Sequence, residues 1–376
     1  MEIELEKMLD RILNEIELSD LEYETAERSY SAIGEYIGNH IQYNLRVFPQ
    51  GSFRLGTVIK PLNEGDEYDV DLVAVVDNKF YNARELKNII GDALKNSQRY
   101  SEKLEEGKRC WTIKYADSAK YHADILPAME SNSYDRTKEL IMTHRESKNA
   151  EYEFKTTNPE AYSDWFFSKI AEERRCLKEE YSIKNKVEIE NIPDYKIKTT
   201  LQSAIKILKR YRDVKFKDNL ENKPISIILT TLMARIYTGA ENVYSLIKKF
   251  ATEYEQYIEK DEDGNYKIVN PVNEKENFAD KWIVHPERQE AFFRFMEDLK
   301  KELVHNVILT EGDFLSQAKE YKRIFGEKIV QDVYQKMADE TRSLREESKL
   351  YINERGNLTQ EKTNNPIKNH NFYGQG

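Results

Sequence analysis

The chain has 376 residues, of which 34% are charged and 11% aromatic, and its formal net charge is -10. This length allows a large buried core and favours two domains over one. The negative charge argues against a protein that coats nucleic acid, because binding many phosphates needs a surplus of Lys and Arg. Any polyanion that the protein binds must therefore meet a local cluster of basic residues.

Neither membrane insertion nor secretion is predicted. No apolar run approaches the roughly 20 residues that span a bilayer, and the first residues, MEIELEKMLDRIL, are acidic where a signal peptide is basic. We therefore expect a cytoplasmic protein without membrane contact. The two cysteines, Cys110 and Cys176, are too few for a disulfide framework, and too few for a four-ligand zinc site unless several histidines join them.

The first part of the chain alternates helical patterns with short β-like runs. The sequence SDLE from Ser19 to Glu22 has the form of a capping box, and the apolar spacing after it predicts a long helix that ends near Gly38. The pattern as a whole predicts an α+β fold, with a mixed sheet and flanking helices over residues 1–160. The predicted strands cover residues 44–48, 69–76, 110–115 and 121–126, and a further helix covers residues 83–95.

From Pro159 onward the pattern is mostly helical and predicts a second lobe over residues 161–355. Residues 195–213 combine an apolar stripe with lysines on another face, which predicts an amphipathic helix that faces the first lobe. Residues 225–237 are apolar nearly all round and predict a buried helix, although their β-branched start leaves a strand open. The remaining predictions are helices at 286–307 and 314–348, polar turns at 261–277 and a flexible tail at 356–376.

The most informative stretch runs from Pro49 to Val76, where a Gly-Ser turn precedes an acidic strand. Side chains alternate along a strand, so Asp69 and Asp71 project from the same face. Asp124, in the later strand HADILP, brings a third carboxylate if the two strands are neighbours. Carboxylates held together repel one another, and bound divalent cations relieve that repulsion. A two-metal site of this kind stabilises the attacking and leaving oxygens of a displacement at phosphorus.

The Gly-Ser turn has a matching use. Gly51 allows the backbone to approach a ligand closely, and the N–H groups of the turn together with the Ser52 hydroxyl can bind phosphate oxygens. Each piece also has an ordinary explanation, since D-x-D is common at strand ends and Gly-Ser marks many turns. His122 is better explained as a hydrogen-bonding support than as a metal ligand. The combination and its spacing favour a nucleotidyl-transfer site.

These motifs resemble those of the cGAS/DncV-like nucleotidyltransferases, the CD-NTases, within the polymerase β superfamily. The resemblance covers about residues 49–237. It rests on PQGSFRLGT, EYDVDLV and HADILPA in the first lobe, and on TNPEAYSDWF, LQSAIKILKRYRD and KPISIILTTL in the second.

The resemblance implies a polymerase β-like lobe packed on a helical lobe, and synthesis of a cyclic di- or trinucleotide from ATP, GTP or other nucleoside triphosphates. It also implies signalling to an antiphage effector. Two Mg²⁺ ions, with Mn²⁺ as a substitute, are expected at Asp69, Asp71 and Asp124. The residues expected to contact the triphosphate are Gln50, Gly51, Ser52, Lys209 and Ser226.

The last two of these positions have alternative interpretations. Lys209 lies on the predicted polar stripe with Lys198 and Lys206, next to Arg210 and Arg212, and this stripe is the expected basic patch. A solvated helix face explains each single lysine equally well. Ser226 lies where a helix is expected to begin, and an N-cap is the favoured explanation for it.

Other functions remain open at this stage. A template-independent RNA or tRNA nucleotidyltransferase shares the motifs but needs a long basic track, and a scaffold that keeps the fold without catalysis does not need all three aspartates. The zinc-binding insertion by which animal relatives position DNA is missing, so activation by DNA is not expected. Some bacterial relatives are conjugated through the C-terminus by a ubiquitin-transferase-like partner, which makes Gly376 a candidate conjugation site.

Overall fold

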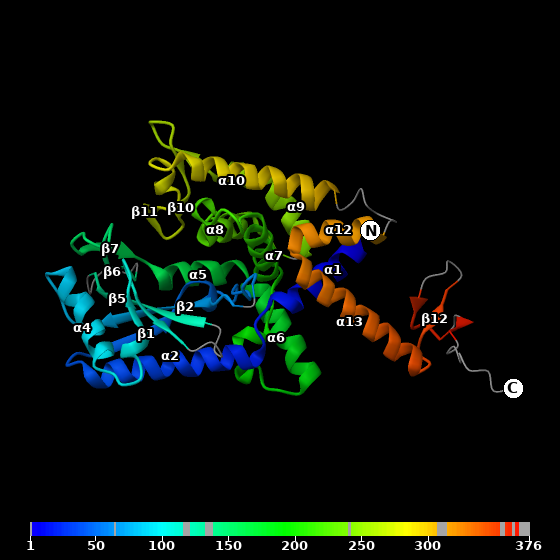
Figure 1. Cartoon of the computed structure of the whole chain (residues 1–376), viewed down its shortest axis with the longest axis horizontal. Coiled ribbons are helices and arrows are strands. Elements are labelled where there is room, and N and C mark those ends of the chain that lie inside the picture. The colour runs from blue at the N-terminus through cyan, green and yellow to red at the C-terminus, as the bar shows by residue number, and fades with distance from the viewer. Residues whose placement is uncertain are drawn as a thin grey trace.

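The structure is a computed structural model that describes residues 2–63, 65–115, 121–131, 138–239, 242–306, 314–353, 358–362 and 365–367. A sheet with flanking helices forms one end of the molecule, and a group of helices forms the rest (Figure 1). This architecture confirms the predicted α+β fold with its mixed sheet and helical second lobe.

The first lobe is built on a seven-stranded mixed sheet. Strands β1, β2, β5, β4 and β3 are neighbours in that order, and β6 and β7 extend the sheet from the second half of β5. Only β2 and β5 are parallel among these neighbours. The strands are β1 (Leu45–Pro49), β2 (Tyr68–Val76), β3 (Leu104–Glu106), β4 (Trp111–Lys114), β5 (Tyr121–Glu130), β6 (Leu140–His144) and β7 (Glu153–Thr157).

The two faces of β2 have different neighbours, as the alternation of side chains predicts. Val70 and Leu72 lie on the face that packs against α2 (Asp20–His40) and α4 (Ala83–Lys95), in a cluster with Ile33 and Ile90 of those helices. The opposite face carries the aspartates at one end and apolar residues at the other. The capping box at Ser19 and Glu22 is present at the start of α2, as predicted.

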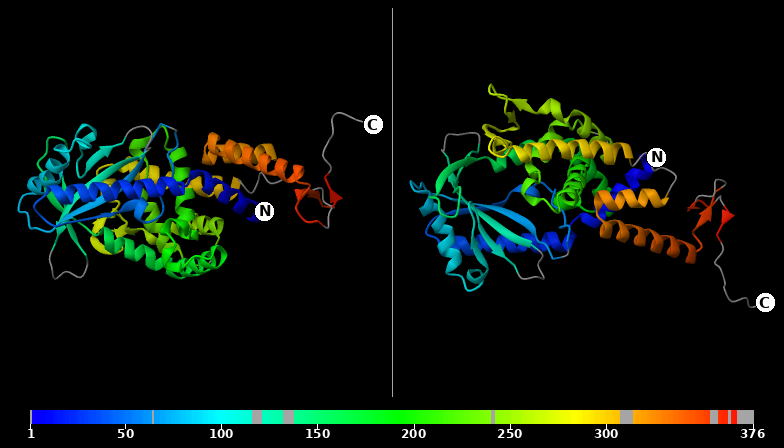
Figure 2. Two further views of the ribbon diagram at one scale, coloured as in Figure 1. Left: turned by 90° about the horizontal axis from the view of Figure 1, so that it is seen from below. Right: turned by 45° about the horizontal axis from the view of Figure 1, so that its top comes forward.

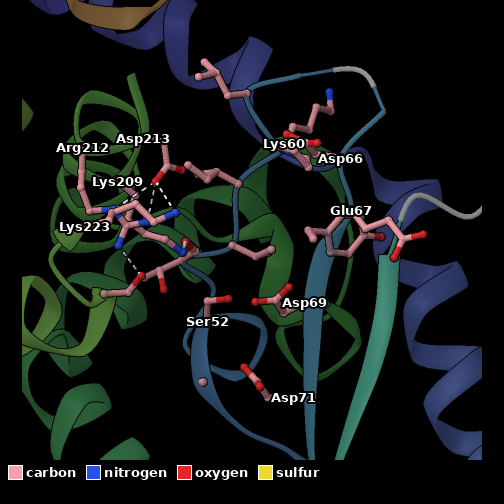
Figure 3. Close-up of a pocket in the computed structure, with 18 of the residues that line it drawn as sticks. Ser52, Lys60, Asp66, Glu67, Asp69, Asp71, Lys209, Arg212, Asp213 and Lys223 are labelled. Atoms are coloured by element: carbon pink, nitrogen blue, oxygen red, sulfur yellow. Dashed lines mark hydrogen bonds and ion pairs between the residues drawn. The ribbon is translucent and has the colours of Figure 1, made fainter. Parts of the chain in front are cut away.

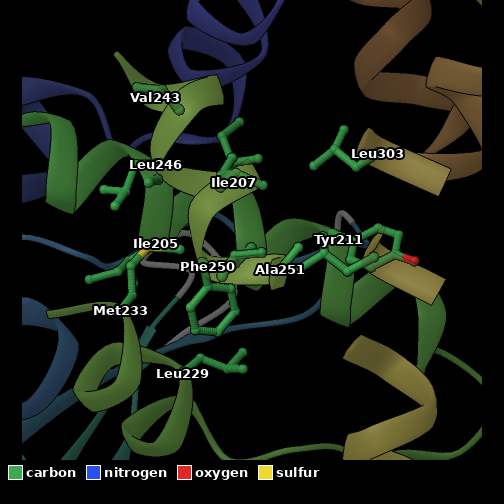
Figure 4. Packing of buried hydrophobic residues seen from close by; sticks show 14 of the residues in the cluster. Ile205, Ile207, Tyr211, Leu229, Met233, Val243, Leu246, Phe250, Ala251 and Leu303 are labelled. Atoms are coloured by element: carbon green, nitrogen blue, oxygen red, sulfur yellow. The ribbon is translucent and has the colours of Figure 1, made fainter. Parts of the chain in front are cut away.

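The second lobe surrounds α7, which is buried over most of its length (Figure 4). The first helix of the chain, α1, also packs into this core. Its position in the sequence, before the sheet, predicts instead that it belongs to the first lobe, residues 1–160. The helices of this part are α1 (Glu2–Ile16), α5 (Pro159–Lys169), α6 (Ala171–Asn185), α7 (Thr200–Lys215), α8 (Ser226–Ile236), α9 (Val243–Glu253), α10 (Pro286–Leu299), the π-helix η7 (Lys300–Asn306), α12 (Phe314–Phe325) and α13 (Glu327–Glu346).

Several elements differ from their predicted form. The amphipathic helix predicted at 195–213 is α7, and its Lys206 and Lys209 are buried rather than solvated because other elements cover that side as well. The helix predicted at 314–348 is broken at Gly326, whose φ of 98° is not helical. In contrast, the buried helix predicted at 225–237 is confirmed by α8, and the strand alternative is wrong. The polar region 261–277 contains short strands, β9 (Tyr266–Lys267), β10 (Val269–Asn270) and β11 (Asn273–Asn277), and β8 (Glu259–Lys260) precedes it.

The end of the described chain forms a small three-stranded sheet of β13, β12 and β14. It lies at the end of α13, away from the two lobes (Figure 2). The strands are β12 (Tyr351–Ile352), β13 (Leu358–Thr359) and β14 (Asn365–Pro366), so part of the stretch predicted as a flexible tail is paired. Gly376, the predicted conjugation site, lies outside the described residues.

Short elements complete the described chain. The four-residue helix α3 (Gly51–Arg54) follows β1 directly. None of the helices among the described residues combines the length and apolar character needed to cross a bilayer. The 3-10 turns are η1 (Ser101–Lys103), η2 (Ile189–Asn191), η3 (Asp194–Lys196), η4 (Leu220–Asn222), η5 (Tyr254–Tyr257) and η6 (Asp280–Trp282).

Candidate active site

The three predicted aspartates meet on the parallel strand pair at the centre of the sheet. In the register of β2 and β5, Asp71 is opposite Asp124, and Asp69 is opposite His122. Because side chains alternate along each strand, all four of these residues project from the same face. The structure therefore brings together residues of two motifs that lie more than 50 residues apart in the sequence.

His122 lies beside this acidic group. Its Nε2 lies 3.1 Å from Asp69 Oδ1 and 3.8 Å from Asp124 Oδ2, and its Nδ1 lies 3.3 Å from Glu67 Oε2. Both ring nitrogens thus face carboxylates, which fits the supporting role expected for this histidine. On the other side of the group, Thr112 Oγ1 donates a hydrogen bond to Asp124 Oδ1.

The electrostatics of the aspartates favour a bound cation. Burial raises the pKa of Asp71 to about 7, and repulsion from Asp69 and Asp124 adds to the effect. Burial also raises the pKa of Asp69. Within the described part of the chain, the Asp71 carboxylate has no hydrogen-bond donor. Carboxylates that repel one another in a half-buried cleft are the donor set that divalent cations take, so these residues fit a metal site.

The Gly-Ser turn lies directly against Asp71. The Gln50 N–H donates to the Asp71 carbonyl at 2.8 Å, which fixes the turn at the acidic strand. Gly51 has a φ of 59°, and a Cβ atom built there would lie 2.5 Å from Asp71 Oδ2. Only glycine fits at this position, for its backbone conformation and for the space next to the carboxylate. Ser52 follows at the edge of the cleft (Figure 3).

A cavity of about 590 Å³ lies between the sheet and the helical lobe. It is large enough for a nucleotide. The acidic residues lie on one side of it, and a basic group from α7 and the residues after it lies on the other (Figure 3). Of the predicted site residues, Gly51, Ser52, Asp69, Asp71, Lys209 and Ser226 line the cavity, whereas Gln50 and Asp124 do not.

Lys209 is a buried cation at the wall of this cavity. Its Nζ donates to the Thr57 carbonyl at 2.9 Å, and burial lowers its pKa to about 8, with a further contribution from nearby Arg212. The solvated helix face considered for this lysine is wrong, because the residue is only 6% exposed. The position suits contact with an anion in the cavity, since an anion would favour the charged form.

Ser226 is the first residue of α8, and the N-cap is Ile225, which has no side-chain capping bond. The N-cap interpretation of Ser226 is therefore wrong by one residue. Its hydroxyl oxygen instead accepts a hydrogen bond of 2.7 Å from Arg212 Nη1. This bond connects the ends of two helices that both face the cavity.

The basic patch expected along α7 is not a surface feature. Lys206 is buried against Glu17 at 2.7 Å, and Arg210 donates to the Lys60 carbonyl at 2.7 Å. The sequence interpretation missed Asp213, Lys217 and Lys223, which line the cavity. Helical spacing from Lys209 was the available signal for Asp213. Lys217 and Lys223 follow the helix, where the helical pattern no longer predicts which way a side chain points.

A second group of potential ligands lies far from this cavity, on β6 and β7. His144, Glu146 and Glu153 offer ligand atoms that all lie within 4.8 Å of one another. Arg109 Nε donates to His144 Nδ1 at 3.0 Å, which leaves Nε2 as the protonated nitrogen of the neutral ring. Lys155 pairs with both glutamates, at 3.4 and 3.3 Å. These groups are thus already paired with one another and with neighbouring cations.

The fold and the site together define a class of protein. A mixed sheet presents three aspartates beside a Gly-Ser turn, and a helical lobe closes the cleft with buried cations. This arrangement is that of a metal-dependent nucleotidyltransferase with a polymerase β-like catalytic lobe.

Known proteins with similar sequences are synthetases of nucleotide second messengers. The Second Messenger Oligonucleotide or Dinucleotide Synthetase domain, SMODS, matches residues 3–169. A c-di-GMP synthase from Roseivirga ehrenbergii is 28% identical over 306 residues, which is 80% of this chain and 78% of that protein. Cyclic dinucleotide synthase CdnG from Bradyrhizobium diazoefficiens is 23% identical over 345 residues, which is 86% of this chain and 81% of that protein.

A solved structure extends the likeness to both lobes. The Bradyrhizobium diazoefficiens CD-NTase CdnG, in complex with GTP, superposes with a TM-score of 0.68 at 20% identity over 87% of this chain and 96% of that chain. The chain thus shares the fold of a CD-NTase over both lobes, and its residues 3–169 match the second-messenger synthetase domain. It is a nucleotidyltransferase with a second-messenger synthetase domain, and enzymes of this family depend on metal.

Proposed function

We propose that this enzyme joins nucleoside triphosphates into a cyclic dinucleotide and releases pyrophosphate, and that the product is cyclic di-GMP. The observation that carries the reaction type is the convergence of Asp69, Asp71 and Asp124 beside the Gly-Ser turn. The choice of guanine is supported by the relatives, of which one is a c-di-GMP synthase and another has been solved with GTP.

The acidic side of the cleft would bind the metal ions. Asp69, Asp71 and Asp124 would hold two Mg²⁺, for which Mn²⁺ would substitute, and the ions would stabilise the attacking and leaving oxygens. Asp124 would also accept the proton of the acceptor ribose hydroxyl, with its carboxylate oriented by Thr112. That hydroxyl oxygen forms a bond to the α-phosphorus, and the bond from phosphorus to pyrophosphate breaks.

The basic side of the cleft would bind the triphosphate. Ser52 and the backbone of the Gly-Ser turn approach it from the sheet, and Lys209 and Ser226 approach it from the helical lobe. These groups lie on both sides of one cavity, so the donor nucleotide would bridge the two lobes. A second transfer, with the linear product turned round in the cavity, would close the ring.

The test is a product assay on the purified full chain. We expect incubation with labelled GTP and Mg²⁺, followed by phosphatase, to leave a resistant product with the mass of cyclic di-GMP. Nuclease digestion of that product would give its linkage. Labelled ATP, CTP and UTP, each alone, should give no resistant product.

Matched variants separate the site from the strand that carries it. Changing Asp69 and Asp71 together to Asn should abolish the product. Asp77→Asn is the control, because Asp77 follows the same strand but is exposed at its other end, where Asn44 contacts it. A mixed or three-membered ring would refute the base or ring size, and growth of an RNA primer would favour the RNA nucleotidyltransferase. A metal-loaded enzyme that makes nothing from any nucleotide mixture would favour the inactive scaffold.

The cellular role follows from the proposed product. A cyclic dinucleotide made in the cytoplasm diffuses to an effector, and we propose antiphage defence as the response, as in this family. Expression of the enzyme with its neighbouring genes should protect cells against phage, and the variant with both aspartates replaced should not.

A further inference from the structure

Arg212 lies at the wall of the cavity but is itself almost fully buried. Only 5% of the residue is exposed. Its guanidinium donates to Asp213 Oδ1 from Nε at 3.0 Å and from Nη2 at 2.7 Å. Its Nη1 donates to the Pro224 carbonyl at 3.2 Å and to Ser226 Oγ at 2.7 Å. One side chain thus connects the end of α7 to the beginning of α8.

These four hydrogen bonds use nearly all the donors of a guanidinium group. Arg212 is therefore poorly suited to grip a phosphate directly, although it lines the cavity. Asp213 also balances much of its charge, and Lys223 lies 3.5 Å from the same carboxylate oxygen. The effect of Arg212 on a ligand must pass through the groups that it holds.

Of the partners of Arg212, Ser226 lines the cavity and carries a hydroxyl group. A hydroxyl has one hydrogen to donate and an oxygen that accepts. Because Arg212 donates to the oxygen of Ser226, the hydroxyl hydrogen must point elsewhere, and the cavity is the open direction. A hydroxyl held in this way presents its hydrogen to the cavity, which suits a phosphate oxygen.

The start of α8 depends on the same contact. Ile225 occupies the N-cap and cannot cap the helix with its side chain, and no side-chain capping bond is present there. The bond from Arg212 to the Pro224 carbonyl fixes the segment before the helix instead. Arg212 therefore sets both the position of Ser226 and the direction of its hydroxyl.

We propose that Arg212 is a positioning residue for triphosphate binding, which acts by fixing the Ser226 hydroxyl as a donor into the cavity. The inference rests on the proposed function only in that a nucleoside triphosphate is the substrate. It does not depend on which base is used or on whether the product is cyclic. The proposal predicts that the effects of replacing Arg212 and Ser226 on affinity are coupled, because a residue that acts through Ser226 loses its effect when the Ser226 hydroxyl is absent.

The experiment measures the dissociation constant of inorganic tripolyphosphate and of a non-hydrolysable GTP analogue, with Mg²⁺, on the full chain. We expect Ser226→Ala to weaken both by roughly tenfold, the size of one hydrogen bond to a charged group. Arg212→Met should weaken both at least as much. The double variant should bind no more weakly than Arg212→Met alone.

Lys217→Met is the matched control, because it removes a charge of the same sign from an exposed position on the same cavity. Its effect should multiply with that of Ser226→Ala, as expected for independent groups. If the effects of Arg212→Met and Ser226→Ala multiply in the same way, Arg212 acts independently and the proposal is wrong. Thermal unfolding of each variant shows whether it is folded at the assay temperature.

Arg212→Lys keeps the charge but loses the planar fork of donors that reaches all three partners. It should bind tripolyphosphate with an affinity between those of the wild type and Arg212→Met, and its effect should also vanish in the Ser226→Ala background. If Arg212→Met is unfolded, the comparison of Arg212→Lys in the wild-type and Ser226→Ala backgrounds tests the proposal in its place. If the effects of Arg212 and Ser226 on tripolyphosphate affinity are coupled but the enzyme makes no cyclic di-GMP, only the proposed product is refuted. Normal product without coupling would refute the role of Arg212 alone.

Discussion

Replacing Gly51 with Ala should separate catalysis from folding more sharply than any other single change. The φ of 59° at Gly51 costs an L-residue about 1–2 kcal/mol. The added Cβ would also lie 2.5 Å from Asp71 Oδ2, closer than real contacts allow. The carboxylate must then move by roughly 1 Å, and a displacement of that size in a reacting group can cost about 100-fold in rate.

We therefore expect Gly51→Ala to lower the free energy of unfolding by only about 1–2 kcal/mol while turnover falls about 100-fold. Urea unfolding and initial rates at saturating nucleotide measure the two effects. Gly38→Ala in α2 is the control, since a Cβ there has open space and the helix should gain up to about 1 kcal/mol. Wild-type turnover in a folded Gly51→Ala enzyme would refute the placement of Asp71 against this turn.

Three further predictions concern the first lobe. Gly91→Ala, normally favourable in a helix, should destabilise the fold by about 1–2 kcal/mol, because its Cβ would lie 2.1 Å from the buried Trp111 ring; a rise in melting temperature would contradict this. Burial lowers the pKa of Lys87 from 10.5 to about 7, so the unfolded chain binds more protons between these values. Stability should therefore rise with pH across that window, and urea titrations of Lys87→Met should lack this contribution. Burial raises the pKa of the Cys110 thiol to about 12, so iodoacetamide at pH 8 should label exposed Cys176 first, as peptide mass spectrometry would show.

The acidic half of the site could be predicted because its geometry is local. Strand alternation places Asp69 and Asp71 on one face whatever surrounds the strand. The position of Asp124 needed one further assumption, that its strand is the neighbour, and the parallel pairing of β2 and β5 confirms it. The Gly-Ser turn was recognisable from sequence, but its contact with Asp71 was not. That contact depends on the antiparallel pairing of β1 with β2, which places the end of β1 beside Asp71.

The basic half could not be predicted because it depends on tertiary packing. A helical pattern shows which residues share a face, but it does not show whether a second layer covers that face. The sequence allows either a basic patch or a solvated face for Lys206 and Lys209, yet Glu17, directly after α1, and the segment before β2 lie against them. Arg212 was visible in sequence as one basic residue among several. Its role depends on Pro224 and Ser226, which only the fold brings next to it.

The burial of these cations bears on the kind of polyanion that an acidic protein can accept. Gln202, Lys209 and Arg210 donate to the carbonyls of Leu55, Thr57 and Lys60, the segment that joins the Gly-Ser turn to β2. The same helix face thus fixes the phosphate side of the cleft to its acidic side. Cations shielded from water interact strongly with a ligand inside the cavity and weakly with anything beyond it. Buried cations of this kind suit a triphosphate inside the cavity better than a long polynucleotide, which needs a continuous basic track, and this favours small nucleotides over RNA as the acceptor.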